Sequence, residues 1–219
     1  MSPPPKKVVV GISGASGAAY AVRLLEQLLL GGHEVHLVVS DYGRRLLHDE
    51  SPMLRRLFAG STGRTDAVIK PLFGDLLPDL ADQRPELNEQ LYVHPYSDVG
   101  AVIASGSFLH DGMAVIPCSS TSLGAIATGA GSNLLTRAAM VTLKEERPLI
   151  ICHREMPLSL VDIENLRTLR LAGASLCSPN PGFYLDPTTI EEIIDFTVGK
   201  VLDLLRIDHD LATRWKGQK

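Results

Sequence analysis

Two adjacent charged residues, Arg154 and Glu155, follow an apolar run at 149–152 that is typical of a buried strand. Consecutive residues of an extended chain point to opposite sides, so one of them could bind an anion while the other faces a second compartment. A glutamate whose pKa is raised towards neutrality by partial burial works as a general acid or base. The pair predicts an anion site with a proton-transfer group, and the alternative is an ordinary surface ion pair.

A second candidate is the small-residue turn at 11–17, which follows the β-branched residues 8–10 and precedes a helical pattern. A strand, a tight turn and a helix N-terminus together present backbone N–H groups to an anion such as phosphate. Glycines allow close approach of a ligand, and Ser13 and Ser16 add hydroxyl donors. The alternative is a βα turn whose small residues only allow close packing. Ser13 replaces a glycine of the dinucleotide fingerprint, and Ser40 replaces the acidic residue that would bind a ribose, so phosphate or flavin is favoured over NAD.

The elements that must position these residues alternate between strands and helices. Strands are predicted at 8–10, 34–39, 101–104, 113–116, 149–152 and 175–177, and helices at 18–30, 41–50, 123–128, 133–146, 159–172 and 188–205. Nearly continuous apolar strands predict a mostly parallel sheet covered on both faces, which is a three-layer α/β fold. Ligands of such sheets bind at the carboxyl ends of the strands. The residues expected at those ends are Ser16, Ser40, Ser105, Ser119 and Arg154 with Glu155.

Length and composition predict one α/β domain over the 219 residues, with 45% hydrophobic and 21% charged residues. Residues 1–5 are expected to be disordered, and 51–96 to form an irregular excursion with a short β-like run at 67–69.

A net charge of −4 gives no signature for nucleic acid, and no apolar run is long enough for a membrane span. We expect a cytoplasmic protein. Its three cysteines and dispersed histidines have no metal-ligand spacing, and the thiols are expected to be buried and reduced.

Several other polar residues could act on a phosphate leaving group. Arg137, Lys144 and Lys200 are cations that could neutralise it, and Tyr184 places a phenol after the last short strand. Each is also explained as a solvated helix charge or a packed turn. Cys152 and His153 suggest a nucleophile, but neighbouring strand residues do not face each other and no third group is evident.

Taken together, these motifs resemble the UbiX-type flavin prenyltransferases over residues 6–50 and 101–216. The motifs that carry the resemblance are Gly14-Ala15-Ser16-Gly17, Ala104-Ser105-Gly106-Ser107, Pro117-Cys118-Ser119, residues 133–139, Leu143-Lys144-Glu145, residues 154–158 and Pro181-Gly182-Phe183-Tyr184. Their number and order make the resemblance specific.

The resemblance implies a Rossmann-like, metal-independent homododecameric enzyme that joins the dimethylallyl group of dimethylallyl monophosphate to N5 and C6 of reduced FMN. The prenylated FMN would then serve a UbiD-type decarboxylase. It implies that FMN is held by Gly14, Ala15, Ser16, Ser40, Ser119, Ser120, Thr121, Ser122 and Arg154. The prenyl phosphate would be held by Ser105, Arg137, Lys144, Tyr184 and Lys200, with Glu50 reaching in from a neighbouring subunit. Glu155 would transfer protons, with Ser16 and Lys144 as further catalytic residues.

Three residues depart from the family pattern. Met140 stands where an aspartate is usual, Asp162 where a histidine is common, and Lys200 where some members have arginine. The first two are expected to alter packing or subunit contacts, and Lys200 lacks the planar fork of arginine. The alternative functions are an FMN-dependent decarboxylase and a non-catalytic flavin-binding protein.

Overall fold

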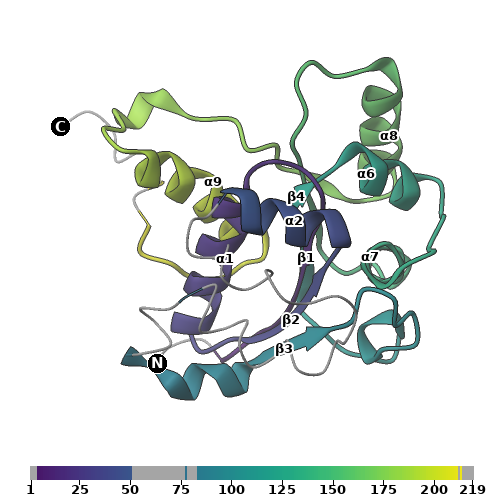
Figure 1. Ribbon diagram of the computed structural model, residues 1–219, viewed down its shortest axis with the longest axis horizontal. Coiled ribbons are helices and arrows are strands. Elements are labelled where there is room, and N and C mark those ends of the chain that lie inside the picture. The colour runs from purple at the N-terminus through teal and green to yellow at the C-terminus, as the bar shows by residue number, and fades with distance from the viewer. Residues whose placement is uncertain (1–3, 51–76, 78–82, 212, 214–219) are drawn as a thin grey trace.

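A parallel sheet between two layers of helices forms the centre of the protein (Figure 1). The computed structural model describes residues 4–50, 77, 83–211 and 213. Among these residues, no helix is both long enough and apolar enough to cross a membrane.

The sheet contains β1 (Lys7–Ile12), β2 (Glu34–Val39), β3 (Leu91–His94), β4 (Gly112–Cys118), β5 (Leu149–His153) and β6 (Ser175–Leu176). Their spatial order is β3-β2-β1-β4-β5-β6, and every described pair is parallel. The chain therefore builds outwards from β1 in one direction and from β4 in the other. This order creates a topological switch point between β1 and β4, where open α/β sheets bind their ligands.

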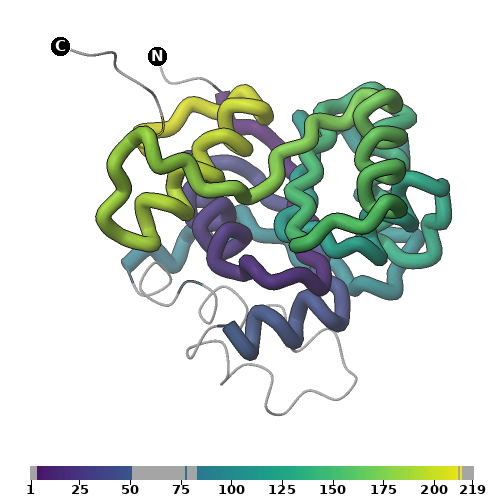
Figure 2. Tube along the Cα trace, turned by 90° about the horizontal axis from the view of Figure 1, so that it is seen from above, coloured from purple at the N-terminus to yellow at the C-terminus, as the bar shows by residue number. Residues whose placement is uncertain are grey.

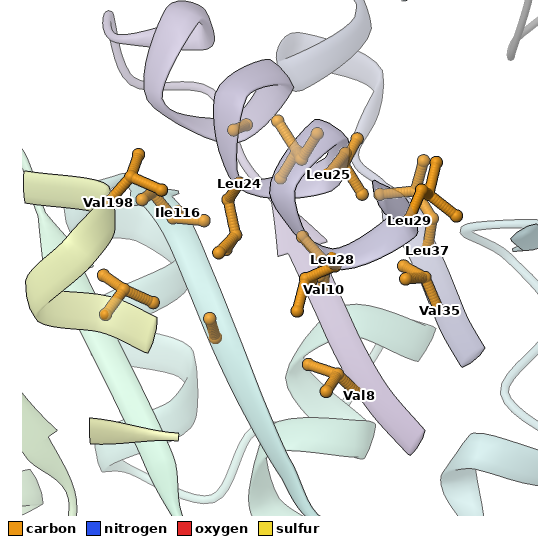
Figure 3. Packing of buried hydrophobic residues seen from close by; sticks show 14 of the residues in the cluster. Val8, Val10, Leu24, Leu25, Leu28, Leu29, Val35, Leu37, Ile116 and Val198 are labelled. Atoms are coloured by element: carbon orange, nitrogen blue, oxygen red, sulfur yellow. The ribbon is translucent and has the colours of Figure 1, made fainter. Parts of the chain in front are cut away.

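One face of the sheet is covered by α1 (Ala18–Leu30) and α9 (Ile190–Leu204). Leucines at helical spacing on α1, among them Leu24, Leu25 and Leu28, contact the alternating valines of β1 and β2, as Figure 3 shows. Full burial of one such side chain contributes about 1.5–3 kcal/mol to the stability of the fold. The packing of this helix layer therefore holds β1 in place, and with it the turn that follows the strand.

The opposite face is covered by α6 (Ser120–Ala127), α7 (Leu134–Lys144) and α8 (Leu160–Leu171), and Figure 2 shows this layer apart from α1 and α9. Strand residues of the alternate register, such as Val9 and Val115, pack against it. The remaining described elements are α2 (Asp41–Glu50), the short 3-10 helices η1 (Pro85–Gln90) and η2 (Val102–Ala104), and a third, η3, at Phe183–Leu185.

The three-layer fold predicted from the sequence is confirmed, and two local predictions were wrong. The apolar run at 101–104 forms η2 rather than a strand, because so short a run is equally compatible with a helical turn packed against α7. Ser105 therefore does not lie at a strand end. The stretch 51–96 contains η1 and the edge strand β3, which the prediction of an irregular excursion missed. The β-like run at 67–69 lies outside the described residues.

Candidate active site

A cavity of about 530 Å³ lies at the switch point of the sheet. The chain reaches it through segments that follow β1, β2 and β4, because parallel strands bring their carboxyl ends to one edge. Its lining consists of Gly14, Ser40, Asp41, Tyr42, Tyr96, Ser119, Thr121 and Ser122. Hydroxyl groups and two aromatic rings predominate in this lining. The cavity has a size usual for small-molecule sites, about 300–1,000 Å³.

The two turns that border this cavity are tied together by Ser13. Its side chain is buried, and Oγ donates to the Pro117 carbonyl at 3.0 Å while accepting from the Ser119 backbone N–H at 2.8 Å. Both bonds join the turn after β1 to the turn after β4. The expectation that the Ser13 hydroxyl binds an anion is therefore corrected, since its partners are groups of the chain itself. A glycine at this position would leave the Ser119 N–H without this acceptor.

Serines at the ends of β2 and β4 begin the helices that follow. Ser40 is buried, and its Oγ accepts from the Gly43 N–H at 2.9 Å. Ser119 is the N-cap of α6, and its Oγ accepts from the Ser122 N–H at 3.3 Å. The Ser119 Oγ also donates to the Ser122 Oγ at 3.3 Å, whereas the Ser40 hydroxyl, which accepts its capping bond, keeps a proton for another partner. These positions thus combine helix initiation with hydroxyl groups that line the cavity.

The N-terminus of α1 is already paired with an anion of the same chain. Gly17 has φ of +118°, and the Glu50 carboxylate at the end of α2 accepts from the Gly17 N–H at 2.9 Å and from the Ala18 N–H at 2.8 Å. The helix dipole favours a negative charge there. The simple expectation that this helix N-terminus cradles a phosphate is corrected, because Glu50 takes its first N–H donors. Glu50 also lines a separate cavity of about 490 Å³ with Arg23 and Asp195.

Arg154 and Glu155 follow β5, which ends one residue earlier at His153. Arg154 is half-buried, its backbone N–H donates to the Cys118 carbonyl at 3.1 Å, and its Nε donates to the Ser16 carbonyl at 3.2 Å. The structure therefore brings Arg154 beside the turn after β1, as the sequence predicted. Glu155 is exposed, and its carboxylate accepts only a local bond from the Met156 N–H at 3.1 Å among those described. Partial burial of Glu155 is thus not present within the single chain, and that expectation is corrected.

The buried residues His153 and Asp162 form a pair that was not predicted from the sequence. His153 is buried, its Nδ1 lies 3.0 Å from the Cys118 carbonyl, and its Nε2 lies 3.8 Å from Oδ1 of Asp162 on α8. Hydrogen bonds from Ser159, together with one from Ser120, lower the pKa of Asp162 to about 2. A third group beside His153 therefore exists, contrary to the sequence analysis. Cys152 packs in the core on the α1 and α9 face, so it does not face His153, as expected.

A second cavity, of about 690 Å³, is lined by residues of α7 and of the segment around η2, and it carries cationic side chains. Arg137 and Lys144 lie two helical turns apart on α7 and therefore share a face, and Ser105 borders the same cavity. The Lys144 ammonium pairs with the Glu145 carboxylate at 2.6 Å. Tyr96, which lines the first cavity, accepts at its carbonyl a hydrogen bond of 2.9 Å from the Leu134 N–H, at the start of the helix that carries Arg137 and Lys144. The guanidinium, ammonium and hydroxyl groups of the second cavity are donors that suit a phosphate.

The remaining predicted phosphate ligands lie elsewhere. The Tyr184 ring packs edge-on against Phe196 with centroids 5.7 Å apart, and the Lys200 Nζ lies 5.9 Å from the centroid of the same ring. The structure thus brings Ser105, Arg137 and Lys144 together, joins Tyr184 and Lys200 at Phe196, and leaves Glu50 at α1. One chain does not assemble the predicted set into a single site.

The sequence analysis missed three residues that line the first cavity: Asp41, Tyr42 and Tyr96. The first two directly follow Ser40, so their place beside a predicted strand end was an available signal. Tyr96 follows the unrecognised strand β3, which left it in the stretch without assigned structure. Met140, noted as a departure, lines the cationic cavity between Arg137 and Lys144. Among the described residues, no group of three or more His, Cys, Asp or Glu side chains could hold a metal ion.

Comparisons with known proteins now add to this geometry. The sequence matches the Flavoprotein family over residues 2–202. It is 42% identical over 210 residues to the flavin prenyltransferase UbiX of Alkalihalophilus pseudofirmus, and the match covers 96% of both chains.

Two solved structures are similar over nearly the whole chain. One is AnUbiX (PadA1) in complex with FMN and dimethylallyl pyrophosphate, with a TM-score of 0.78, 31% identity, and coverage of 99% of this chain and all of that one. The other is a dodecameric FMN-dependent UbiX-like decarboxylase from Escherichia coli O157:H7, with a TM-score of 0.78, 36% identity, and coverage of 96% and 100%. By its sequence and its fold, this chain belongs to the UbiX-type flavin prenyltransferases of the Flavoprotein family.

Proposed function

We propose that the protein is a flavin prenyltransferase that joins the dimethylallyl group of dimethylallyl monophosphate to N5 and C6 of reduced FMN. The observation that carries this proposal is the 42% identity to a named flavin prenyltransferase across 96% of both chains. The presence of two cavities of different chemistry supports it, because the reaction needs one site for a flavin and another for a phosphate ester.

The hydroxyl-lined cavity fits FMN in its chemistry. Hydroxyls and backbone N–H groups suit a flavin phosphate, and Tyr42 and Tyr96 offer aromatic surface for a planar ring. The residues proposed to hold FMN are Gly14, Ala15, Ser16, Ser40, Ser119, Ser120, Thr121, Ser122 and Arg154. Reduced FMN supplies the two ring atoms that accept the prenyl group.

The cationic cavity holds the prenyl phosphate. Phosphate leaves a carbon atom readily only when donors and positive charges receive its developing negative charge, and preorganised groups do this best. Arg137 offers a planar fork for two phosphate oxygens, Lys144 a point charge, and Ser105 a hydroxyl. Because Lys144 already pairs with Glu145, phosphate binding exchanges one anionic partner for another.

Glu155 moves the proton that ring closure releases. A carboxylate does this best when its pKa is raised towards neutrality, and exposure in the single chain prevents that. Burial of Glu155 by the bound flavin and by a neighbouring subunit would provide the missing desolvation. Ser16 and Lys144 complete the proposed catalytic set, Ser16 through its contact with Arg154.

A homododecamer is the proposed assembly, in which neighbouring chains bring Glu50, Tyr184 and Lys200 to the prenyl phosphate. Large apolar side chains are exposed after Arg154 and Glu155 in the chain, on α8 and on η3: Met156, Leu160, Val161, Leu171 and Phe183. Contacts between subunits would remove such surface from water. Native mass spectrometry should give a complex of about twelve chains, and a monomer would contradict this part of the proposal.

The proposed recipient of the product is a UbiD-type decarboxylase, and the proposed compartment is the cytoplasm. The three cysteines are free thiols, which fits a reducing compartment. Transfer is tested by adding the reaction product to a cofactor-free decarboxylase of that type and measuring release of carbon dioxide from an unsaturated acid.

The activity is tested by incubating the purified protein anaerobically with reduced FMN and dimethylallyl monophosphate and weighing the flavin. We expect a flavin heavier by one dimethylallyl group, and a parallel reaction with the diphosphate identifies the preferred donor. Recovery of unmodified FMN with both donors would contradict the proposed prenyl transfer.

Substitution of Glu155 by Gln separates catalysis from binding. The variant should bind FMN normally and form product about 100- to 10,000-fold more slowly, because it lacks the proton-transfer group. Glu164→Gln is the matched control, since Glu164 is an exposed carboxylate on the following helix. Full activity of Glu155→Gln would remove Glu155 from the mechanism.

A decarboxylase is the second candidate, favoured by the description of the E. coli structure at 36% identity. It predicts release of carbon dioxide from an aromatic acid by the protein with FMN alone. Absence of that release, together with formation of the prenylated flavin, decides for the transferase.

A further inference from the structure

Two cysteines outside the proposed site lie side by side on neighbouring strands. The pairs Ile150–Ser175 and Ile151–Leu176 define the parallel register of β5 and β6, and one further step brings Cys152 level with Cys177. The Cys177 backbone N–H donates to the Ile151 carbonyl at 2.9 Å, so the pairing continues to this residue. Residues at the same level of adjacent strands point to the same face, and both cysteines pack in the core beneath α1 and α9.

This placement meets the spatial requirement of a disulfide. Adjacent strands lie about 4.7–4.9 Å apart. The Cα atoms of disulfide-bonded cysteines are usually about 4.4–6.8 Å apart. Both thiols are free in the structure. The expected Cα separation of the two cysteines is therefore compatible with a disulfide.

The two sulfur atoms differ in chemical character. Hydrogen bonding between the thiols lowers the pKa of Cys177 and raises that of Cys152, and the positive charge of Lys200 also lowers the pKa of Cys177. Cys177 is half-buried whereas Cys152 is fully buried. The thiolate is the form that reacts, so Cys177 is the attacking group and Cys152 the group that follows. The third cysteine, Cys118, provides contrast, because burial raises its pKa to about 12.

We propose that Cys152 and Cys177 form a modification site at which hydrogen peroxide produces a disulfide. The Cys177 thiolate attacks one peroxide oxygen, the O–O bond breaks, and hydroxide leaves and takes up a proton as water. The Cys152 thiol then attacks the Cys177 sulfenic acid, and a second water leaves as the S–S bond forms. Two thiols and one peroxide thus give one disulfide and two waters, with the sulfur atoms oxidised and the peroxide reduced.

The bond would close the segment 153–176 at its two ends. That segment contains Arg154, Glu155 and the whole of α8, and it is held to the sheet at His153. Cys177, whose pKa is lowered in part by the charge of Lys200, loses its ionisable thiol in the same step. Oxidation would therefore take place next to residues of the proposed site. The pairing of the two cysteines does not depend on the proposed function.

The test is to reduce the folded protein, remove the reductant, add hydrogen peroxide, and quench with catalase. Remaining thiols are then alkylated with N-ethylmaleimide in denaturant, and a non-reducing digest is analysed by mass spectrometry. We expect peptides joined through Cys152 and Cys177, while Cys118 is recovered alkylated. A mixture of ¹⁵N-labelled and unlabelled protein should give no mixed-isotope cross-link, because the bond forms within one chain.

Control variants make the result specific. Cys177→Ser should abolish the cross-link and leave Cys152 alkylated, whereas Cys118→Ser should leave the cross-link unchanged. Recovery of Cys152 as an alkylated thiol while Cys177 carries a sulfinic acid would overturn the proposal. Cross-links to Cys118 or between isotopes, at the same peroxide dose, would overturn it equally.

Discussion

The hydroxyl-lined cavity and the cationic cavity are built differently. The first is lined by short hydroxyl side chains and two tyrosines from segments that follow strands, and the bond from Ser13 to Pro117 ties two of these turns together. The second is lined by Arg137 and Lys144, which are long, exposed and carried by one helix. The described lining of the first cavity is therefore held by the chain's own sheet.

The difference explains why the proposed flavin ligands converge and the proposed phosphate ligands do not. Backbone hydrogen bonds fix a turn once the strands have paired, whereas an exposed guanidinium keeps its rotamer freedom until an anion binds. Tyr184 and Lys200 meet at Phe196, away from Arg137. We therefore expect contacts within one chain to dominate at the proposed FMN site, and contacts between subunits to matter more at the proposed prenyl phosphate site.

The largest effect that tests this comparison is expected for Arg137→Ala. Loss of a charge that stabilises the leaving phosphate should slow prenyl transfer by about 100- to 1,000-fold. FMN affinity, measured by fluorescence titration, should stay unchanged because Arg137 does not line the first cavity. Arg167→Ala on α8 is the matched control, since that guanidinium is also exposed. Equal loss of FMN affinity and turnover would show that the two cavities are not separable.

A smaller effect, on stability and FMN affinity together, is expected for Ser13→Ala. The change leaves the buried Pro117 carbonyl and the Ser119 N–H with one partner fewer, at a cost of about 1–3 kcal/mol. Urea unfolding and flavin titration should both detect it. The control is Ser107→Ala, whose hydroxyl is exposed and bonds only to Ser105 among the described residues. Unchanged unfolding of the Ser13 variant would contradict the proposed tie between the turns.

The smallest effect is an acid sensitivity that arises at Asp162. Hydrogen bonds from Ser159 hold the pKa of this carboxyl at about 2 in the folded chain, below its ordinary value of 3.8. The unfolded state therefore binds the proton more tightly, so the stabilisation is present above pH 3.8 and is lost as the pH falls towards 2. In urea unfolding, Asp162→Asn should be less stable than the parent at pH 5, and the difference should shrink near pH 2. A constant difference across this range would contradict the assigned pKa.

Helices α1 and α2 were predicted with their observed bounds, because their apolar periodicity and flanking residues agree. Strand β3 was missed because Leu91–His94 lies at the sheet edge after a stretch rich in proline and charge. The family that the motifs predicted is confirmed by the family match and by the similar proteins. The individual site roles stay predictions, and the variants above test them.

The sequence by itself determined the alternation of strands and helices and the placement of serines after β2 and β4, since both follow from local patterns. Only the tertiary structure decided that Glu50 pairs with the N-terminus of α1, that Asp162 lies beside His153, and that Ser13 bonds to Pro117. Each of these contacts joins residues that are brought together by parallel pairing and helix packing. No local pattern can predict them, because hydrogen bonds between distant segments depend on how the layers pack.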